Sequence, residues 1–223
     1  MISKLPRWIW IGAWVLAFVA GMVNVTGLLG IERQAITHLT GTTSMLAVAV
    51  ANLDAGKTFH FTAAILSFVA GCMISGFLIQ DSTLRLGRRY GAALFLESIL
   101  LCAAVPLLRR GNLVGIYFAS CACGLQNAMV TTYSGSIVRT THLSGMFTDL
   151  GIFIGHAARG LPVDLRRLRL CLLIISAFLA GGIAGTLAFN RMGYTALFIP
   201  GAFTAIIALA YAIYRMRHTR IEA

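Results

Sequence analysis

The sequence predicts an all-α, polytopic transmembrane helical bundle of about six crossings, with two short broken or re-entrant segments and two inverted internal repeats. Three observations lead to this fold class. First, 58% of the residues are hydrophobic and 11% are charged, with a mean hydropathy of +0.84, which lies outside the range of soluble domains. Second, apolar stretches long enough to cross about 30 Å of hydrocarbon recur along the whole chain. Third, several motifs of the first half return in the same order in the second half.

Three pairs of motifs carry the repeat. THLTG at 37–41 returns as THLSG at 141–145, GMVN at 21–24 as GLQN at 124–127, and FVAG at 68–71 as FLAG at 178–181, at offsets of 104, 103 and 110 positions. Because the order is kept and the offsets are similar, we interpret the pairs as an internal duplication. The chain is then a single membrane domain, 1–223, with repeat unit one at about 8–110 and repeat unit two at about 111–215.

Six of the apolar runs are long enough to be crossings. The first follows Lys4 and Arg7 and resembles a signal peptide, but cleavage would remove part of unit one, so we keep it as the first helix. Two further apolar runs are shorter, and at 1.5 Å per residue each spans only about half a bilayer. We also predict loops at 54–60, 81–89 and 159–169, and a kink at Pro200-Gly201. The predicted crossings are 8–29, 61–79, 90–108, 113–130, 170–189 and 194–214, and the short runs are 44–53 and 146–154.

The number of crossings depends on whether the two short runs span the membrane or re-enter it. With re-entry there are six crossings, and the lysines and arginines divide 13 to 5 between the two faces; with spanning there are eight, and they divide 12 to 6. The first division and the short lengths favour six crossings, with both termini cytoplasmic. Each unit then has three crossings, and units with an odd number are inverted relative to each other. If the short segments turn at their glycines, their helix N-termini point to mid-membrane and favour an anionic group there.

The paired motifs also resemble those of a known family. GxxN at 21–24 with THLTG, then GLQNA at 124–128 with THLSGxxTDLG at 141–151, is similar to the YoaK-type family of bacterial membrane proteins. The resemblance covers nearly the whole chain and implies an inner-membrane protein of about six helices with no established reaction. The first half departs from the family pattern, since an acidic residue is usual in place of Asn24 and an asparagine in place of Thr42. The resemblance therefore implies a different substrate or coupling ion if those positions matter to the activity.

Polar residues inside apolar segments are the candidates for a functional site. A carboxylate at mid-bilayer costs about 2.5–3.5 kcal/mol on insertion scales, so Asp149 and Glu97 should face protein, water or a partner. His38 and His142 occupy matching places and carry a side chain that titrates near neutral pH. Caps and interhelical hydrogen bonds are the structural alternative for all of them. The predicted substrate or ion-binding residues are Asn24, His38, Thr40, Gly41, Glu97, Gln126, Asn127, His142, Ser144, Gly145 and Asp149.

Several functional classes are disfavoured. The net charge of +11 suggests nucleic acid in a soluble protein, but here the basic residues lie between apolar segments, as the positive-inside rule requires. We predict no catalytic motif, no metal site, no disulfide and no cofactor, although a membrane-embedded hydrolase using His142 and Asp149 stays open. The sequence thus predicts a transporter-like protein, not an enzyme, whose partners are the lipid bilayer and a small solute or ion. A non-transporting scaffold or accessory subunit is the alternative, and homodimerisation is left open.

Overall fold

Helices make up every regular element of the described chain. The computed structural model describes residues 7–31, 33–79, 88–133 and 140–219, except the side chains of 7–9, 88, 133 and 214–219. The all-α prediction is confirmed for these residues, which contain no strand. The elements are α1 (Arg7–Leu29), α2 (Leu39–Ala51), α3 (Ala55–Leu78), α4 (Arg88–Arg109), α5 (Val114–Tyr133), α6 (Leu143–Ala158), α7 (Leu165–Met192), the 3₁₀ helix η2 (Gly193–Leu197) and α8 (Phe198–Thr219).

Three predicted local features are wrong, each for a physical reason. Residues 165–169 are not part of a loop, because Asp164 accepts hydrogen bonds from the Arg166 and Arg167 N–H groups and caps α7, which begins at Leu165. Residues 54–60 are not a loop, because Asp54 accepts a hydrogen bond from the Lys57 N–H and caps α3, which begins at Ala55. That backbone N–H also lowers the pKa of the Asp54 carboxyl. The helical run is interrupted at η2 and not at Pro200, which lies in the first turn of α8, where a missing N–H costs no hydrogen bond. The predicted loop at 81–89 lies mostly outside the described residues.

By length and composition, four stretches of the described residues qualify as membrane spans. They are Trp10–Leu29, Ala55–Leu78, Arg89–Arg109 and Leu165–Ile213. The last contains α7, η2 and most of α8, so it is two helices in sequence. Helix α5 is not among the four, and it carries the polar side chains of Gln126, Asn127, Thr131 and Thr132 in its second half. These apolar helices are compatible with a membrane protein.

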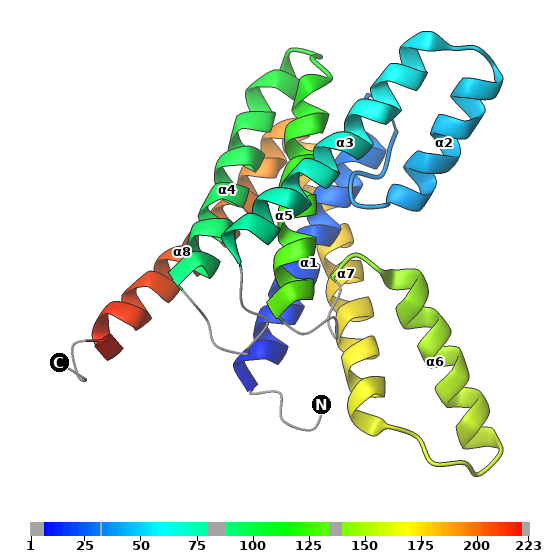
Figure 1. Ribbon diagram of the computed structural model, residues 1–223, viewed down its shortest axis with the longest axis vertical. Coiled ribbons are helices and arrows are strands. Elements are labelled where there is room, and N and C mark those ends of the chain that lie inside the picture. The colour runs from blue at the N-terminus through cyan, green and yellow to red at the C-terminus, as the bar shows by residue number, and fades with distance from the viewer. Residues whose placement is uncertain (1–6, 32, 80–87, 134–139, 220–223) are drawn as a thin grey trace.

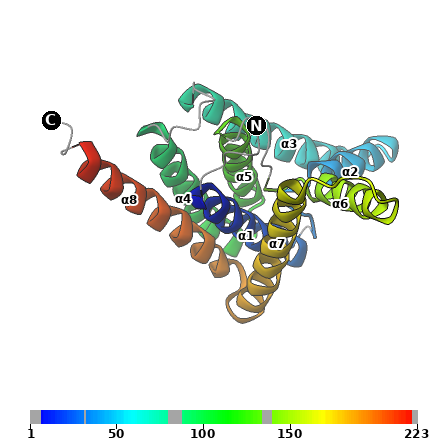
Figure 2. The ribbon, with the colours of Figure 1, turned by 90° about the horizontal axis from the view of Figure 1, so that it is seen from below.

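The two halves of the chain pack crosswise. Helix α1 of the first half lies against α7 of the second, α5 lies against α3, and α4 packs on both α5 and α8 (Figures 1 and 2). Helices α1 and α7 run parallel to each other (Figure 1). Helices α3 and α5 also run parallel to each other, but in the direction opposite to α1 and α7. The short helices α2 and α6 form hairpins with α3 and α7. Corresponding helices of the two halves, α1 and α5 or α3 and α7, therefore run in opposite directions.

Glycines of the repeated motifs make close crossings between α1 and α7 and between α3 and α5. At each of the four, a Cβ atom would overlap with a carbonyl oxygen of the opposing helix, so the backbones are in direct contact. The contacts pair Gly21 with Phe178 and Gly181 with Phe18 between α1 and α7, and Gly71 with Cys121 and Gly124 with Phe68 between α3 and α5. The GxxN motif of each half thus meets the FxAG motif of the other half.

Candidate functional site

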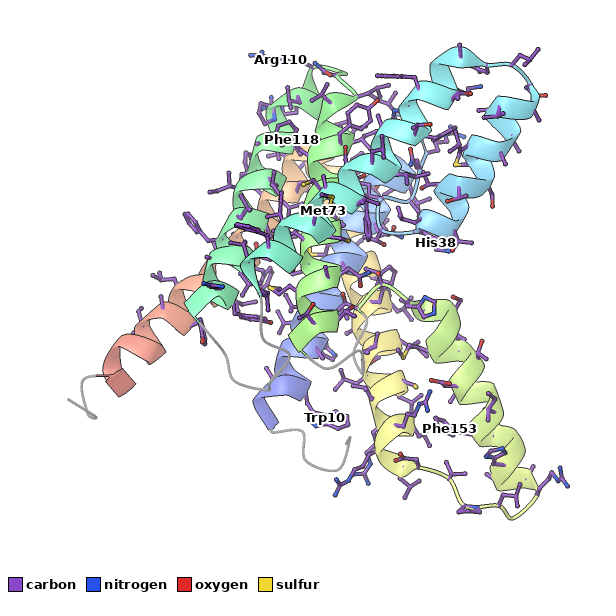
Figure 3. All side chains as sticks on the ribbon, in the orientation of Figure 1. Trp10, His38, Met73, Arg110, Phe118 and Phe153 are labelled. Carbon is purple, nitrogen blue, oxygen red and sulfur yellow. The ribbon has the colours of Figure 1, made fainter. Side chains whose placement is uncertain are left out.

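The short helices begin in the middle of the molecule and run toward opposite ends. After α1 ends, residues 33–38 lead back without helix to His38, the N-cap residue of α2, and His142 is the N-cap residue of α6. Figure 1 shows the starts of α2 and α6 facing each other, and Figure 3 shows His38 at this end of α2. Neither histidine side chain caps its helix. The N–H groups of the first turns, 39–41 and 143–145, have no hydrogen-bond partner among the described residues.

An asparagine holds each of these starts in place. Asn24 Oδ1 accepts hydrogen bonds from the backbone N–H of Thr37 at 3.1 Å and from its hydroxyl at 2.8 Å. Asn127 Oδ1 accepts one from the Thr141 hydroxyl at 3.1 Å. The GxxN motif therefore fixes the threonine of the THL motif within its own half. For neither Nδ2 group is a partner found in the described part of the chain.

A cavity of about 740 Å³ lies between the two helix starts. Its walls come from both halves, and most lining residues form pairs at matching positions of the repeat. The described lining contains hydroxyl, amide and imidazole groups but no carboxylate, lysine or arginine. The lining residues are Asn24, Leu28, Ala35, Thr37, His38, Leu39, Thr40, Phe68, Cys72, Asn127, Ala128, Thr131, Thr132, Thr141, His142, Leu143, Ser144 and Phe178.

The glycines of the THL motifs make room for the imidazoles. A Cβ atom on Gly41 would lie 2.8 Å from His38 Nδ1, and one on Gly145 would lie 2.7 Å from His142 Nε2. Both glycines are inside the first helical turn, three positions after the cap. The chain therefore does not turn at these glycines, and the alternative expectation, that they permit close packing, describes them. Their missing side chains let each imidazole lie against the start of its own helix.

The predicted site residues divide into two groups. The cavity lining includes Asn24, His38, Thr40, Asn127, His142 and Ser144, with Gly41 and Gly145 directly behind the imidazoles. Gln126, Asp149 and Glu97 lie elsewhere. The buried Gln126 donates from Nε2 to the Leu16 carbonyl at 2.6 Å and ties α5 to α1. Asp149 forms an ion pair with Arg167 at 2.9 Å and ties α6 to α7.

Glu97 is the most unusual of these residues. Its side chain is only 1% exposed in the middle of α4, and its Oε2 atom has no hydrogen-bond partner in the part of the chain that the structure describes. It does not line the cavity.

A buried polar network beside the cavity is not among the predicted site residues. His60 contacts Tyr117 Oη through Nδ1 at 3.1 Å and Gln34 Oε1 through Nε2 at 3.0 Å. Gln34 in turn donates to the Thr42 hydroxyl at 3.1 Å, which links α3 to the start of α2. The assignment of 54–60 to a loop concealed this network, because a histidine inside an apolar helix would have been a signal for a buried partner.

Metal-binding chemistry finds little support in the described residues. They contain no group of three or more His, Cys, Asp and Glu side chains placed to hold a metal ion. All five cysteines are free thiols, and of these only Cys72 lines the cavity.

Comparison with protein families identifies the chain. Residues 12–210 match the model of the family described as protein of unknown function (DUF1275), and the chain belongs to that family. The resemblance to a family of unknown function is confirmed at this level, and the closer YoaK-type affinity stays a prediction. Neither the curated proteins nor the solved structures provide a match.

Proposed function

We propose that this family member is a transporter-like protein of the bacterial inner membrane that binds a small solute in the cavity between α2 and α6. The observation that carries the proposal is the composition of the cavity wall. Asn24, His38 and Thr40 from one half stand opposite Asn127, His142 and Ser144 from the other. A site shared between two repeats of opposite direction is the arrangement that alternating-access transporters use.

The helix directions support six crossings and two inverted units. In this proposal α1, α3, α4, α5, α7 and α8 cross the membrane, while α2 and α6 are re-entrant half-helices entering from opposite faces. Irregular backbone at membrane depth is tolerated where it lines a watery cavity, and residues 33–38 do so in part.

The distribution of basic residues supports an orientation of the protein across the membrane. The basic turn between α6 and α7 lies at the end of the molecule that carries Trp10, and Arg110 lies at the other end (Figures 1 and 3). That turn and the first residues of α7 contain Arg159, Arg166, Arg167 and Arg169. By the positive-inside rule this end would be the cytoplasmic one, and the start of α1 and the end of α8 lie on the same side of the molecule (Figure 1). We therefore keep cytoplasmic termini as part of the proposal.

The groups that meet in the cavity favour a solute rich in hydrogen-bond acceptors. The first-turn N–H groups of α2 and α6, the asparagine amides and the Thr40 and Ser144 hydroxyls all offer donors. The positive ends of two helix dipoles face the same space, and the described lining has no carboxylate to hold a cation. A neutral or anionic solute is therefore preferred over a metal ion.

A scaffold or accessory subunit is the second candidate, and two contacts favour it. Gln126 and Asp149 both make polar contacts between helices. Such contacts are what polar residues provide in a membrane protein that has a structural role and transports nothing. The ion pair also argues against a hydrolase, because Asp149 is bonded to Arg167 and is absent from the cavity wall that contains His142. We propose no enzymatic activity, and homodimerisation stays a prediction.

Cysteine accessibility tests the topology. Single cysteines are introduced across 31–53 and 135–156 in a cysteine-free background, and an impermeant thiol reagent is applied from each side of the membrane. Re-entry predicts that the two flanks of each short segment are labelled from the same side and that the two segments are labelled from opposite sides. Labelling of the two flanks from opposite sides would mean eight crossings and parallel units, and would end the proposal.

The same variants test solute binding. Thr40→Cys and Ser144→Cys should react with small water-soluble thiol reagents, and a bound solute should slow both reactions. Leu53→Cys, 91% exposed in the turn between α2 and α3 and outside the cavity lining, is the control that should react with the same reagents and that the solute should not protect. A scaffold predicts that no solute in a screen of small anions and polar neutral compounds protects either cavity position.

A further inference from the structure

An apolar groove on the outer face of α1 and α7 adjoins the cavity. Its volume is about 450 Å³, and it shares three lining residues with the cavity: Asn24, Leu28 and Phe178. The remaining lining residues are Val25, Leu179, Gly182, Ile183, Thr186 and Leu187. The polar site and the apolar groove are therefore neighbours with a common wall.

The groove opens toward the outside of the bundle. Its walls Leu179, Ile183 and Leu187 are 61%, 55% and 58% exposed, and they lie on one stripe of α7. In a membrane this stripe faces hydrocarbon. The hydroxyl of Thr186 donates to the Gly182 carbonyl at 2.8 Å, so it makes no polar demand on the groove. An alkyl chain can thus lie in the groove, because the open side of the groove is in contact with the lipid hydrocarbon.

A difference between the repeat halves accounts for the open groove. Gly182 leaves space between α7 and α1, since a Cβ there would meet only Val25 Cγ1 at 3.4 Å. The matching position on α3, 110 residues earlier, is Cys72, whose thiol donates to the Gly124 carbonyl at 3.3 Å. The thiol therefore occupies, between α3 and α5, the space that glycine leaves open between α7 and α1.

We infer that the ligand of this protein is a single-chain amphiphile that enters from the bilayer. This inference rests on the proposed function, because the cavity holds the polar head of the ligand and the groove holds its chain. The donors around the cavity select a head that accepts hydrogen bonds, such as a carboxylate. The lining extends along α7 from Phe178 to Leu187, about 13 Å at 1.5 Å per residue, which suits an extended chain of about ten to twelve carbons.

Photo-crosslinking in phosphatidylcholine nanodiscs tests the inference. The probe is dodecanoate with a diazirine near the end of its chain, and modified peptides are mapped by mass spectrometry. We expect modification of α1 around Val25 and of α7 around Ile183, and competition by unlabelled dodecanoate but not by dodecyltrimethylammonium. A phosphatidylcholine with a diazirine in its acyl chain should label the exposed face without competition. Labelling that dodecanoate does not compete, or that is equally strong on α3, would identify ordinary boundary lipid and overturn the inference.

Two glycine variants provide the matched pair. Gly182→Leu fills the groove and should reduce competed labelling by about tenfold, the effect of excluding about two methylene groups. Gly76→Leu adds the same side chain to α3, where a Cβ has no neighbour within 4 Å, and should leave labelling unchanged. Equal labelling of the two variants would refute the groove as the chain site. Gly182→Ala gives an intermediate loss if Gly182→Leu does not assemble.

A short acid separates this inference from the proposal on which it rests. Butyrate has the same head and almost no chain, and its protection of Thr40→Cys from alkylation reports on the cavity alone. If butyrate protects Thr40→Cys while dodecanoate shows no competed labelling, the cavity site stands and the amphiphile inference falls. If neither effect is seen, both fall.

Discussion

Substitution of the crossing glycines provides the sharpest test of the fold. In Gly181→Ala, the new Cβ overlaps with the Phe18 carbonyl oxygen of α1, at a separation that real Cβ atoms essentially never show. The obstacle is backbone, so only a shift of α1 away from α7 removes it. Overpacking costs about 1–3 kcal/mol, and because no side chain can yield here we expect the upper value, about 3 kcal/mol. At Gly76 a Cβ meets nothing, and alanine should stabilise the helix by up to about 1 kcal/mol. The two variants should thus differ by about 3–4 kcal/mol.

The assay is reversible unfolding in mixed micelles or bicelles, with the free energy of unfolding measured for single and double variants. Gly21→Ala and Gly181→Ala force the same separation of α1 and α7, so the double variant should cost about 0.5–3 kcal/mol less than the sum of the singles. Gly21→Ala combined with Gly124→Ala affects two different crossings and should be additive. A difference between Gly181→Ala and Gly76→Ala of less than about 1 kcal/mol, or additivity within the α1–α7 pair, would refute the crosswise packing.

Three further changes test local features. Asp149→Asn and Arg167→Gln should each lower the stability of the α6–α7 hairpin by about 1 kcal/mol or less, as measured by thermal unfolding. The double variant should lose no more stability than either single variant. A loss of solute protection in Asp149→Asn alone would contradict a purely structural ion pair. Gly145→Ala should displace the His142 imidazole rather than unfold α6, which a changed rate of histidine modification at unchanged helicity would show. Leu53, in the turn between α2 and α3, is 91% exposed and has a φ of 55°. This left-handed conformation costs a residue other than glycine about 1–2 kcal/mol, so Leu53→Gly should raise the thermal stability. A lower stability would contradict that backbone conformation.

The sequence predicts helix positions well because they depend on local hydrophobicity. The six long apolar runs are helical over nearly their whole length, and the short runs fall in α2 and α6, although residues 52 and 53 of the first form the turn after α2. The boundaries were harder, since they depend on single side-chain bonds. Asp54 and Asp164 accept hydrogen bonds from the backbone and begin α3 and α7 earlier than hydropathy indicates. The predicted short runs omit the first turns of α2 and α6, because those turns contain the polar residues of the THL motifs.

The repeated motifs located the cavity, but they did not reveal how it is built. The repeat predicts Asn24, His38 and their counterparts as site residues, and six of the predicted residues line one cavity. The sequence does not predict the crosswise pairing of α1 with α7 and of α3 with α5. A repeat shows that two segments are alike, but it does not show which helix of the other half each one packs against. Isolated polar residues were ambiguous for the same reason. A carboxylate such as Asp149 carries no mark of whether its partner is a solute or Arg167.

The two halves differ where the first contains the buried polar network. Thr42 and His60 match Met146 and Leu170 of the second half, and both of those residues are buried in an apolar cluster. The start of α2 is therefore attached to its hairpin by hydrogen bonds, and the start of α6 by apolar packing. Polar contacts that must all be satisfied fix one arrangement, whereas apolar contacts tolerate small displacements. This asymmetry predicts that α6 is the more mobile of the two short helices.

Replacing the network by the residues of the second half tests this asymmetry. His60→Leu alone leaves Gln34 Oε1 buried without its imidazole partner and should destabilise the protein by about 1–3 kcal/mol. Adding Gln34→Val and Thr42→Met removes two of the three remaining polar partners and leaves only the Tyr117 hydroxyl, so much of that loss should be recovered, because removing both partners of a buried hydrogen bond can be nearly neutral. Hydrogen exchange of the α2 amides should then approach the rate of the α6 amides. If the triple variant is less stable than His60→Leu, or if α2 exchanges as slowly as before, the network does not hold α2 in place and the asymmetry has another origin.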